Sequence, residues 1–569
     1  MLRKLLPLLL ILLLAGCALR DATHGNDVEP DADHVDVNQE EPDPDADQLD
    51  ADADADADAD QPDADDPDAD EPDADEPTTV HLFVSPDGDD SDNGMTTESP
   101  LQTLGAAIDQ AHDLDGPVVI LLTAGDEFVA DRPIEGPVSI RGGMVVGDNQ
   151  WTADGEPSQI LSGGQTWGSL HTTLILTREE GDRDEPAFLE QLVIQPPPIP
   201  TTPATGVATV VAHRFDVDAI HLQDVTILGG EGSDGRAGAN AENLSVTTGS
   251  GQPGNDGFEA SANATVIGGG GGSNSCGGAG GAGGNAGGCE VNGGQGQNGE
   301  DGTLAGGSAQ PGAGGAGGDS WCSQEQVDGE DQGQNGEPGV NGAHGTPGSF
   351  PENPFGSIGE DGWQPVAGQA GTNGQSGGGG GGGGAGGSGE DSGGGVQFIA
   401  ASGGGGGAGG CGGQPGDNGE HGGISIALLL VDAIATFDAV TLVAGEGGDA
   451  GRGGDSNCGR SGAAGGPGGE REGAQSGDGG DGGPGGRGGD GGPGAGGHGG
   501  ATIGLAIADA PLSFTVPITF EGFETEVDGE PVIKGAAGRG GSTDCPDGEV
   551  QGQGGMVGPI EEIFQFPEE

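Results

Sequence analysis

Residues 479–500 read GGDGGPGGRGGDGGPGAGGHGG, and glycine occupies every third position from Gly479 to Gly500 without a break. A period of three residues is that of the polyproline II conformation, whose backbone makes no hydrogen bonds within its own segment. The chain holds 132 glycines among 569 residues, and they concentrate in two stretches, 229–422 and 445–500. Both stretches are much longer than the loops of compact domains, so their conformation decides the fold of the second half.

The glycine stretches have three interpretations. A collagen triple helix would suit Gly333–Gly348, where glycine keeps strict register, but the register lapses on either side and the eight glycines Gly377–Gly384 lack proline. Two interpretations remain open. The stretches are either flexible coil or extended segments packed through backbone hydrogen bonds, resembling the polyglycine II bundles of some antifreeze proteins and fibre tips. Cysteine crosslinks would offset part of the entropy that glycine loses on ordering, which favours partial order.

Copies of one β-rich segment flank the second glycine stretch. Residues 422–433 (GGISIALLLVDA) align without gaps with residues 499–510 (GGATIGLAIADA), and residues 225–228 have a counterpart in 440–443. Each copy is a pair of β-rich runs followed by glycine. This predicts stacked coils that share a core, with the glycine-rich excursions leaving from one edge.

Three aspartates, Asp218, Asp432 and Asp509, recur at corresponding places in these copies. They form either a ladder of carboxylates or a set of turn residues. Each stands beside alanine at the end of a β-rich run, which favours the turn interpretation.

Ordered structure is expected to begin near Val80, where a β-rich run enters an Asp/Gly-rich turn. Further on, four apolar residues have the spacing of one helical face: Leu104, Ala107, Ile108 and Ala111. Short β-rich runs separated by Gly, Pro and Asp then continue to Ile194.

Residues 83–94 (FVSPDGDDSDNG) and 99–108 (SPLQTLGAAI) resemble the opening of a domain of unknown function in the pectate-lyase-like superfamily. The resemblance implies an all-β fold: a right-handed parallel β-helix whose open N-terminal end is capped by the helix. Because this superfamily contains polysaccharide lyases and hydrolases, it also raises the question of catalysis.

The N-terminus carries Arg3 and Lys4, an apolar stretch from Leu5 to Leu14 that is too short to span a bilayer, and then Leu14-Ala15-Gly16-Cys17. This pattern resembles the bacterial lipobox, which implies a lipid on Cys17 and the membrane as a partner. The following residue is Ala18 rather than the aspartate of inner-membrane retention. We therefore expect an outer-membrane anchor in the cell envelope, facing either the periplasm or the medium.

Residues 18–78 are predicted to be a disordered acidic tether. Asp and Ala alternate from Asp50 to Asp60, and neither Lys nor Arg occurs between Asp21 and Thr78. Repelling carboxylates and small alanines cannot offset the entropy of ordering the chain. The net charge of the whole chain, −79, argues against nucleic acid as a partner.

These features predict seven regions. They are the signal peptide and lipobox (1–17), the tether (18–78), the N-terminal part of the β-helix (79–228), a glycine-rich insertion (229–422), one coil (423–444), a second glycine-rich insertion (445–500), and the C-terminal part with its tail (501–569).

Six cysteines follow Cys17, and an even number in an exported chain favours disulfides: Cys276, Cys289, Cys322, Cys411, Cys458 and Cys545. Sequence alone leaves 15 complete pairings open. The absence of a CxxC pair argues against a zinc site.

Asp87, Asp89 and Asp92 are candidate calcium ligands, and Glu98 falls at the twelfth position of an EF-hand-like count from Asp87. However, glycine is second rather than sixth in that count, at Gly88. We therefore interpret the loop as a turn, with calcium as the alternative and no other cofactor indicated.

The best catalytic constellation in the sequence is His213, Arg214, Asp216 and Asp218. It is weak, because no comparable basic group occurs in the later copies and Lys534 is the one lysine beyond the signal. A polysaccharide-cleaving site would need two carboxylates as acid and base, together with Arg or Lys on the same face of the coil to neutralise a uronate.

Three classes of function therefore stay open. The first is a lipid-anchored structural or adhesive protein of the cell envelope, which contacts other surface proteins and has no evident catalysis. The second is a protein that binds or degrades extracellular polysaccharide. The third is an ice- or ligand-binding repeat surface.

Overall fold

The computed structural model describes residues 79–567, apart from 115, 148–149, 179–185, 244, 246–247, 261–263, 277, 290–296, 298, 301, 304–308, 321, 323–330, 351–352, 354, 360–361, 391–395, 510–516, 528–529 and 547. For 216–219, 260, 527 and 530 it describes only the backbone. The signal peptide, Cys17 and the tether lie outside the described residues.

The described part is mostly β, with one helix, α1 (Leu104–His112). The main sheet contains β1 (Val80–Val84), β2 (Val118–Thr123), β3 (Glu127–Ala130), β4 (Ile134–Glu135), β5 (Val138–Gly147), β6 (Gln150–Thr152), β7 (Ser158–Ser162), β8 (Gln165–Trp167), β9 (Leu170–Thr177), β10 (Phe188–Ile194), β11 (Gly206–Leu228), β19 (Ser425–Asp438), β20 (Thr441–Val443), β21 (Thr502–Ala508), β22 (Thr519–Glu521) and β27 (Ile560–Gln565). Short antiparallel pairs or trios are formed by β12 (Phe258–Ala260), β13 (Thr265–Val266), β14 (Ala286–Gly287), β15 (Ser357–Gly359), β16 (Gly362–Gln364), β17 (Gly389–Glu390), β18 (Gln397–Ile399), β23 (Glu526–Val527), β24 (Glu530–Pro531), β25 (Ser542–Cys545) and β26 (Gly548–Gln551).

The main sheet runs in the order β1-β2-β5-β10-β11-β19-β21-β27, and its neighbours along this path are parallel. Strand β11 pairs with β9 over its first third and with β10 over its last third. The two repeat copies pair in the predicted alignment, with Ser425 opposite Thr502 and Val431 opposite Ala508. The all-β character and the register of the repeats are therefore as predicted.

The long strands bend where single residues take left-handed backbone angles. Arg214, Asp432 and Asp509 have φ of +64°, +48° and +55°. The register sets Arg214, not Asp218, opposite Asp432, because His213 pairs with Val431 and Phe215 with Ala433. The sequence correspondence of Asp218 with Asp432 and Asp509 was therefore wrong. A second set of bends falls at Gln191, Asp224 and Ala439, which are also in register.

The apolar core lies along the strands and under α1. The predicted helical face is confirmed, since Leu104, Ala107, Ile108 and Ala111 are all buried. Thr103 caps the helix by accepting from Ala106 N. The four buried residues of α1 belong to the same apolar cluster as residues of the strands, which include Leu82, Ile120, Ile140, Leu189, Val210, Leu222, Leu428 and Leu505. A second apolar cluster includes Val211, Leu429 and Ile503, so β11, β19 and β21 contribute side chains to both clusters.

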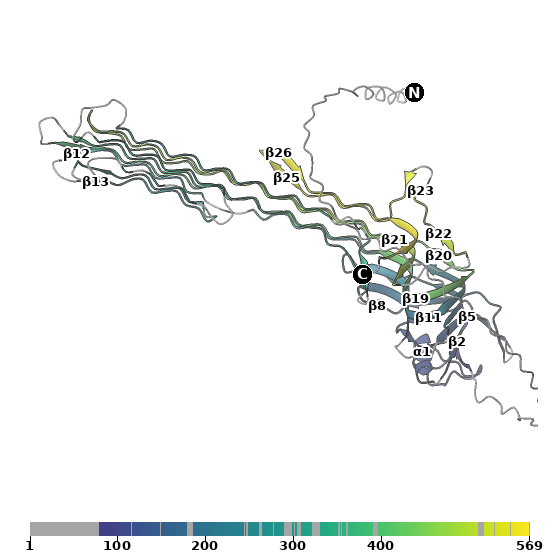
Figure 1. The fold of residues 1–569 in the computed structure, drawn as a ribbon. Helices are drawn as coiled ribbons and strands as arrows, with labels where there is room; N and C mark the ends of the chain where they lie inside the picture. Colours follow the sequence, from purple (N-terminus) through teal and green to yellow (C-terminus); the bar gives the residue numbers. More distant parts are fainter. Residues whose placement is uncertain are drawn as a thin grey trace, which may run out of the picture. The chain divides into compact units, whose positions relative to one another are not determined.

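The described residues of the glycine stretches form a bundle of extended segments, which Figure 1 shows side by side between the main sheet and the strands β12 and β13. Every third amide from Gly404 to Gly422 donates to the carbonyl 76 positions later, beginning with Gly404 to Gly480 and ending with Gly422 to His498. Ser425 N donates to Ala501 O with the same offset, and β19 and β21 follow. One hydrogen-bond ladder therefore continues from the bundle into the sheet.

The eight glycines Gly377–Gly384 form a central segment of this bundle, and all are buried. Three successive amides donate in three directions: Gly380 to Gly407, Gly381 to Glu337 and Gly382 to Glu300, each at 2.9 Å. Three carbonyls accept from three other segments: Gly379 from Gly312, Gly380 from Gly281 and Gly381 from Gly483. The segment is therefore surrounded on all sides by backbone.

No side chain fits in this central segment. A Cβ on Gly380, Gly381 or Gly382 would lie 2.0 to 2.1 Å from a backbone oxygen of a neighbouring segment. Real Cβ atoms do not approach oxygen so closely, and the neighbour cannot rotate away as a side chain could. Glycine is required here by contact between segments, not by backbone angles.

We expect Gly381→Ala to destabilise the bundle by about 1–3 kcal/mol, the usual cost of overpacking. The loss must exceed the roughly 0.4–1 kcal/mol by which alanine stabilises a protein through its less flexible unfolded chain. Guanidinium unfolding measures the difference. The matched control is Ala343→Ser at an exposed bundle position, which should change little. Equal midpoints for the two variants would contradict the packing.

Candidate functional site

The predicted catalytic residues lie at a bend in β11. His213 is half-buried in this strand, with its ring centroid 6.0 Å from that of Trp167, and Arg214 is exposed at the left-handed position. The side chains of Asp216 and Asp218 lie outside the described residues.

The loop that carries the candidate calcium ligands is organised as a turn. Asp87, Asp89 and Asp92 are exposed, and Asp89 Oδ1 accepts from Ser91 N at 2.9 Å. This backbone hydrogen bond lowers the pKa of Asp89. The loop is anchored by a different carboxylate, because Asp90 accepts from Gln102 N and Thr103 N at 2.8 Å, next to the start of α1.

All six predicted cysteines are crosslinked, as Cys276–Cys411, Cys289–Cys322 and Cys458–Cys545. The sequence separations of the three disulfides are 135, 33 and 87 residues. Two of the disulfides join residues within the first glycine stretch, and the third joins Cys458 in the second stretch to Cys545 beyond it. The disulfides therefore close long loops of the bundle.

Asp and Asn side chains complete the hydrogen bonding of the outer bundle segments. Each carboxylate or amide oxygen accepts from the backbone N–H of a neighbouring segment, at 2.7 to 2.9 Å. The donor and acceptor pairs include Asp449 N to Asp234 Oδ1, Asp455 N to Asn240 Oδ1, Asp481 N to Asn335 Oδ1, Arg487 N to Asn341 Oδ1 and Ala536 N to Asp449 Oδ1. Outer segments lack a neighbouring carbonyl in some directions, and these side chains supply the acceptor.

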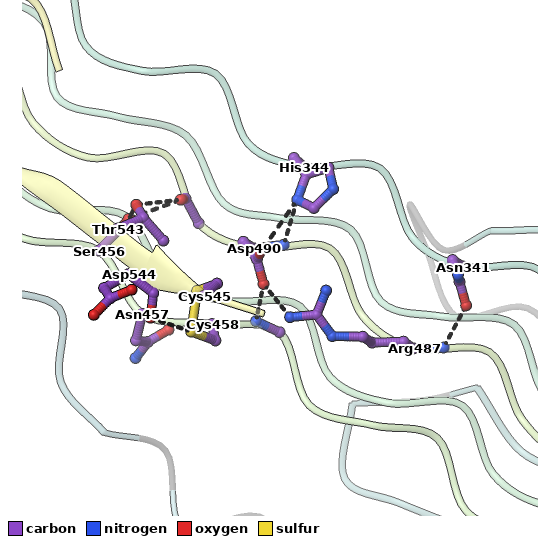
Figure 2. A network of polar contacts seen from close by, with 12 residues as sticks. Asn341, His344, Ser456, Asn457, Cys458, Arg487, Asp490, Thr543, Asp544 and Cys545 are labelled. Carbon is purple, nitrogen blue, oxygen red and sulfur yellow. Dashed lines mark hydrogen bonds and ion pairs between the residues drawn. A yellow bond between two sulfur atoms is a disulfide. The ribbon is translucent and has the colours of Figure 1, made fainter. Parts of the chain in front are cut away.

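Asp490 is the centre of a polar network in the bundle (Figure 2). Its side chain is 7% exposed, and Oδ1 accepts from Gly459 N at 2.8 Å and from Arg487 Nη2 at 2.6 Å. His344 Nδ1 lies 3.3 Å from Oδ2 and accepts from Asp490 N at 3.1 Å. A carboxylate this buried is stable only with such partners.

The Cys458–Cys545 disulfide lies beside Asp490 in Figure 2. Ser456 and Thr543 contact each other, and both donate to Gly491 O. We call Asp490, His344, Arg487 and this disulfide the clasp. It connects the segments around 344, 458, 490 and 545, so its position makes it a crosslink of the bundle.

The two sulfurs and a carboxylate oxygen of Asp490 lie within 4.8 Å of one another, the one grouping of potential metal ligands among the described residues. In the disulfide the sulfurs are not thiolates, so this form lacks the ligands that a metal needs. A polar cleft of about 420 Å³ opens beside Cys458 and is also lined by Asn243, Asp455, Asn457, Arg460 and Asp544.

A second buried cluster lies where the bundle meets the sheet. His421 and His498 stand four residues before β19 and β21, at equivalent places in the repeat, with ring centroids 5.3 Å apart. Phe350 packs against both rings. Burial, with a smaller contribution from His498, lowers the pKa of His421 to about 4. Its Nε2 has no hydrogen-bond partner within the described part.

A hollow of about 300 Å³ lies on the outer surface of the sheet, lined by Val119, Ser139, Ile140, Arg141, Phe188 and Glu190. The register places Arg141 beside Glu190, and the two side chains form an ion pair. Phe188 is 37% exposed and stacks on His221, with ring centroids 4.7 Å apart. An exposed ring beside charged groups is an arrangement that can hold a polar ligand with an apolar face.

Sequence reasoning identified the cysteines of the clasp but not Asp490, His344 or Arg487. It also did not identify the pair His421 and His498, or the hollow at Arg141 and Glu190. The histidine pair had a signal, since His-Gly-Gly precedes both aligned β-rich runs, at His421 and His498. Arg141 and Glu190 had none, because 49 residues separate them and only the strand register brings them together.

Comparison of the chain with protein-family models, curated proteins and solved structures finds no match. Over the described ranges, no helix has the length and apolar character that crossing a bilayer requires.

We expect removal of the clasp disulfide by Cys458→Ser/Cys545→Ser to cost about 4–5 kcal/mol, from the loop-closure entropy of its 87-residue separation. Cys289→Ser/Cys322→Ser, which opens a 33-residue separation, is the control and should cost less by roughly 1 kcal/mol. Guanidinium unfolding and amide hydrogen exchange of the bundle glycines measure both losses. Unchanged protection in the clasp variant would show that other contacts hold these segments.

Protonation of His421 should destabilise the junction. The unfolded chain takes up this proton near pH 6.5 and the folded chain only near pH 4. Stability from this group is therefore complete above pH 6.5 and lost as the pH falls to 4, by roughly 3 kcal/mol. Unfolding midpoints across this range measure the loss, and His421→Phe should remove it. His81→Gln, at an exposed position, is the control and should keep it. An equally steep pH dependence in His421→Phe would contradict the assignment.

Proposed function

We propose that this protein is a lipid-anchored structural or adhesive component of the cell envelope, which holds a rigid glycine bundle away from the membrane. The observation that carries the proposal is the central segment Gly377–Gly384, whose surroundings are entirely backbone. Such a bundle encloses no room for a substrate, and its outer segments present side chains at intervals of about 9 Å, three residues at about 3.1 Å each.

The proposal includes a right-handed parallel β-helix as the base of the bundle. Two observations support it: parallel pairing at every step of the path from β1 to β27, and two sets of in-register left-handed bends. Parallel connections are almost always right-handed. The lipobox around Cys17 supplies the anchor in this proposal, and the acidic residues 18–78 supply the spacer.

A second candidate function, binding of extracellular polysaccharide, is favoured by the hollow at Arg141, Glu190 and Phe188. An exposed ring can stack on a sugar face while the charged pair engages hydroxyl or carboxylate groups. In this second candidate function the sheet surface at the hollow contacts the polysaccharide, and the bundle serves as a rigid support.

The experiment compares cells that produce the full chain with cells that produce Cys17→Ser. We expect the full chain to carry a radiolabelled acyl group, to fractionate with the envelope and to increase cell attachment to surfaces. Cys17→Ser should lose all three properties, because without the lipid nothing in the proposal retains the chain.

Equal fractionation and attachment of the two strains would reject the anchored adhesive function. The second candidate is tested separately, by binding of the purified chain to a polysaccharide panel. Arg141→Gln should reduce that binding, whereas Arg452→Gln on an outer bundle segment should not. Equal binding by both variants would reject the hollow as the site.

A further inference from the structure

We propose that the clasp is a latent metal site: when the Cys458–Cys545 disulfide is reduced, the two thiolates and Asp490 bind one Zn²⁺, which replaces the covalent crosslink. The proposal is independent of the function proposed above. It starts from the placement of the two sulfurs and a carboxylate oxygen within 4.8 Å of one another. Zinc binds sulfur at about 2.3 Å and carboxylate oxygen at about 2.0–2.2 Å. Once the S–S bond is broken, the two sulfurs must move apart to roughly 3.7 Å, the separation of two such ligands in a tetrahedral site, while the carboxylate stays beside them.

The charges around the site also fit. Two thiolates and one carboxylate carry three negative charges, of which Zn²⁺ neutralises two. Arg487 Nη2, 2.6 Å from Asp490 Oδ1, supplies the remaining positive charge. Gly459 N donates to the same oxygen and fixes the orientation of the carboxylate. Outer partners of this kind hold metal-binding carboxylates in place.

Access and the fourth ligand come from the cleft beside Cys458, about 420 Å³ in volume and lined by polar residues. A water molecule from this cleft can complete a tetrahedral site. The other two disulfides provide an internal comparison, because no cysteine of these pairs belongs to a ligand grouping among the described residues.

The chemistry balances with a dithiol as the reductant. The dithiol transfers two electrons and two protons to the disulfide, the S–S bond breaks, and the dithiol becomes a cyclic disulfide. Zn²⁺ then displaces the protons of the two thiols into solvent, while Asp490 binds as the anion that it already is. The link between the two segments changes from S–S to S–Zn–S.

The test uses the full chain, reduced with dithiothreitol and transferred to reductant-free, oxygen-free buffer. Co²⁺ serves as the spectroscopic probe, because thiolate coordination gives a charge-transfer band and tetrahedral geometry gives visible absorption. We expect equimolar Co²⁺ to produce both signals and Zn²⁺ to abolish them by displacement. Asp490→Asn should weaken binding by about tenfold or more.

Cys458→Ser/Cys545→Ser should lose both signals, whereas the matched variant Cys276→Ser/Cys411→Ser should keep them. The reverse pattern would overturn the proposal. Because full reduction can unfold the chain, Cys545→His is examined without reductant, with the other two disulfides intact. It retains one thiolate, adds an imidazole and should bind Co²⁺. Absence of thiolate coordination both in the reduced chain and in Cys545→His would reject the site.

Discussion

The structure depends on one constraint: backbone segments approach so closely that each central residue contacts the backbone of its neighbours directly. Gly380, Gly381 and Gly382 show the consequence, since three successive amides donate to three segments while neighbouring carbonyls accept from three more. Each amide–carbonyl bond contributes only about 1 kcal/mol net, but leaving one unmade inside the bundle would cost more. The glycine content follows from this packing. Outer segments face fewer neighbours, so they can carry the prolines, aspartates and asparagines of the sequence.

The same constraint connects the bundle to the sheet. The ladder from Gly404 to Gly422 keeps a single offset and passes into β19 and β21 without a break. The apolar side chains packed against β19 and β21 fix the register of these strands. The glycine segments that precede the strands keep the same register, although they have no apolar side chains to fix it. The clasp and the pair His421 and His498 reinforce this arrangement, the first within the bundle and the second where it meets the strands.

Sequence reasoning predicted what depends on local pattern. The helical face of Leu104, the pairing of the two β-rich copies and the presence of disulfides all have signals within a short window or an exact repeat. For 229–422 and 445–500 it favoured partial order on account of the cysteines but left flexible coil open, because coil and bundle share the same composition and differ only in contacts between distant segments. The disulfide pairing could not be predicted for the same reason, since Cys276 and Cys411 are 135 residues apart in sequence and meet only when the bundle forms. The correspondence assigned to Asp218 was wrong because β11 contains a register irregularity between Phe215 and Ile220, which leaves no mark in the sequence.

The two parts of the ordered chain exclude different kinds of surface from water. The sheet covers leucine, isoleucine and valine, whereas the central bundle segments cover peptide groups and almost nothing else. Exposure of apolar surface raises the heat capacity of unfolding and exposure of polar surface lowers it, so the bundle should unfold with a small or even negative change. Hydrophobic stabilisation weakens on cooling, and hydrogen bonding between peptide groups does not share that dependence. One chain therefore combines a base whose stability curve is strongly curved with a bundle whose stability is nearly flat and persists in the cold.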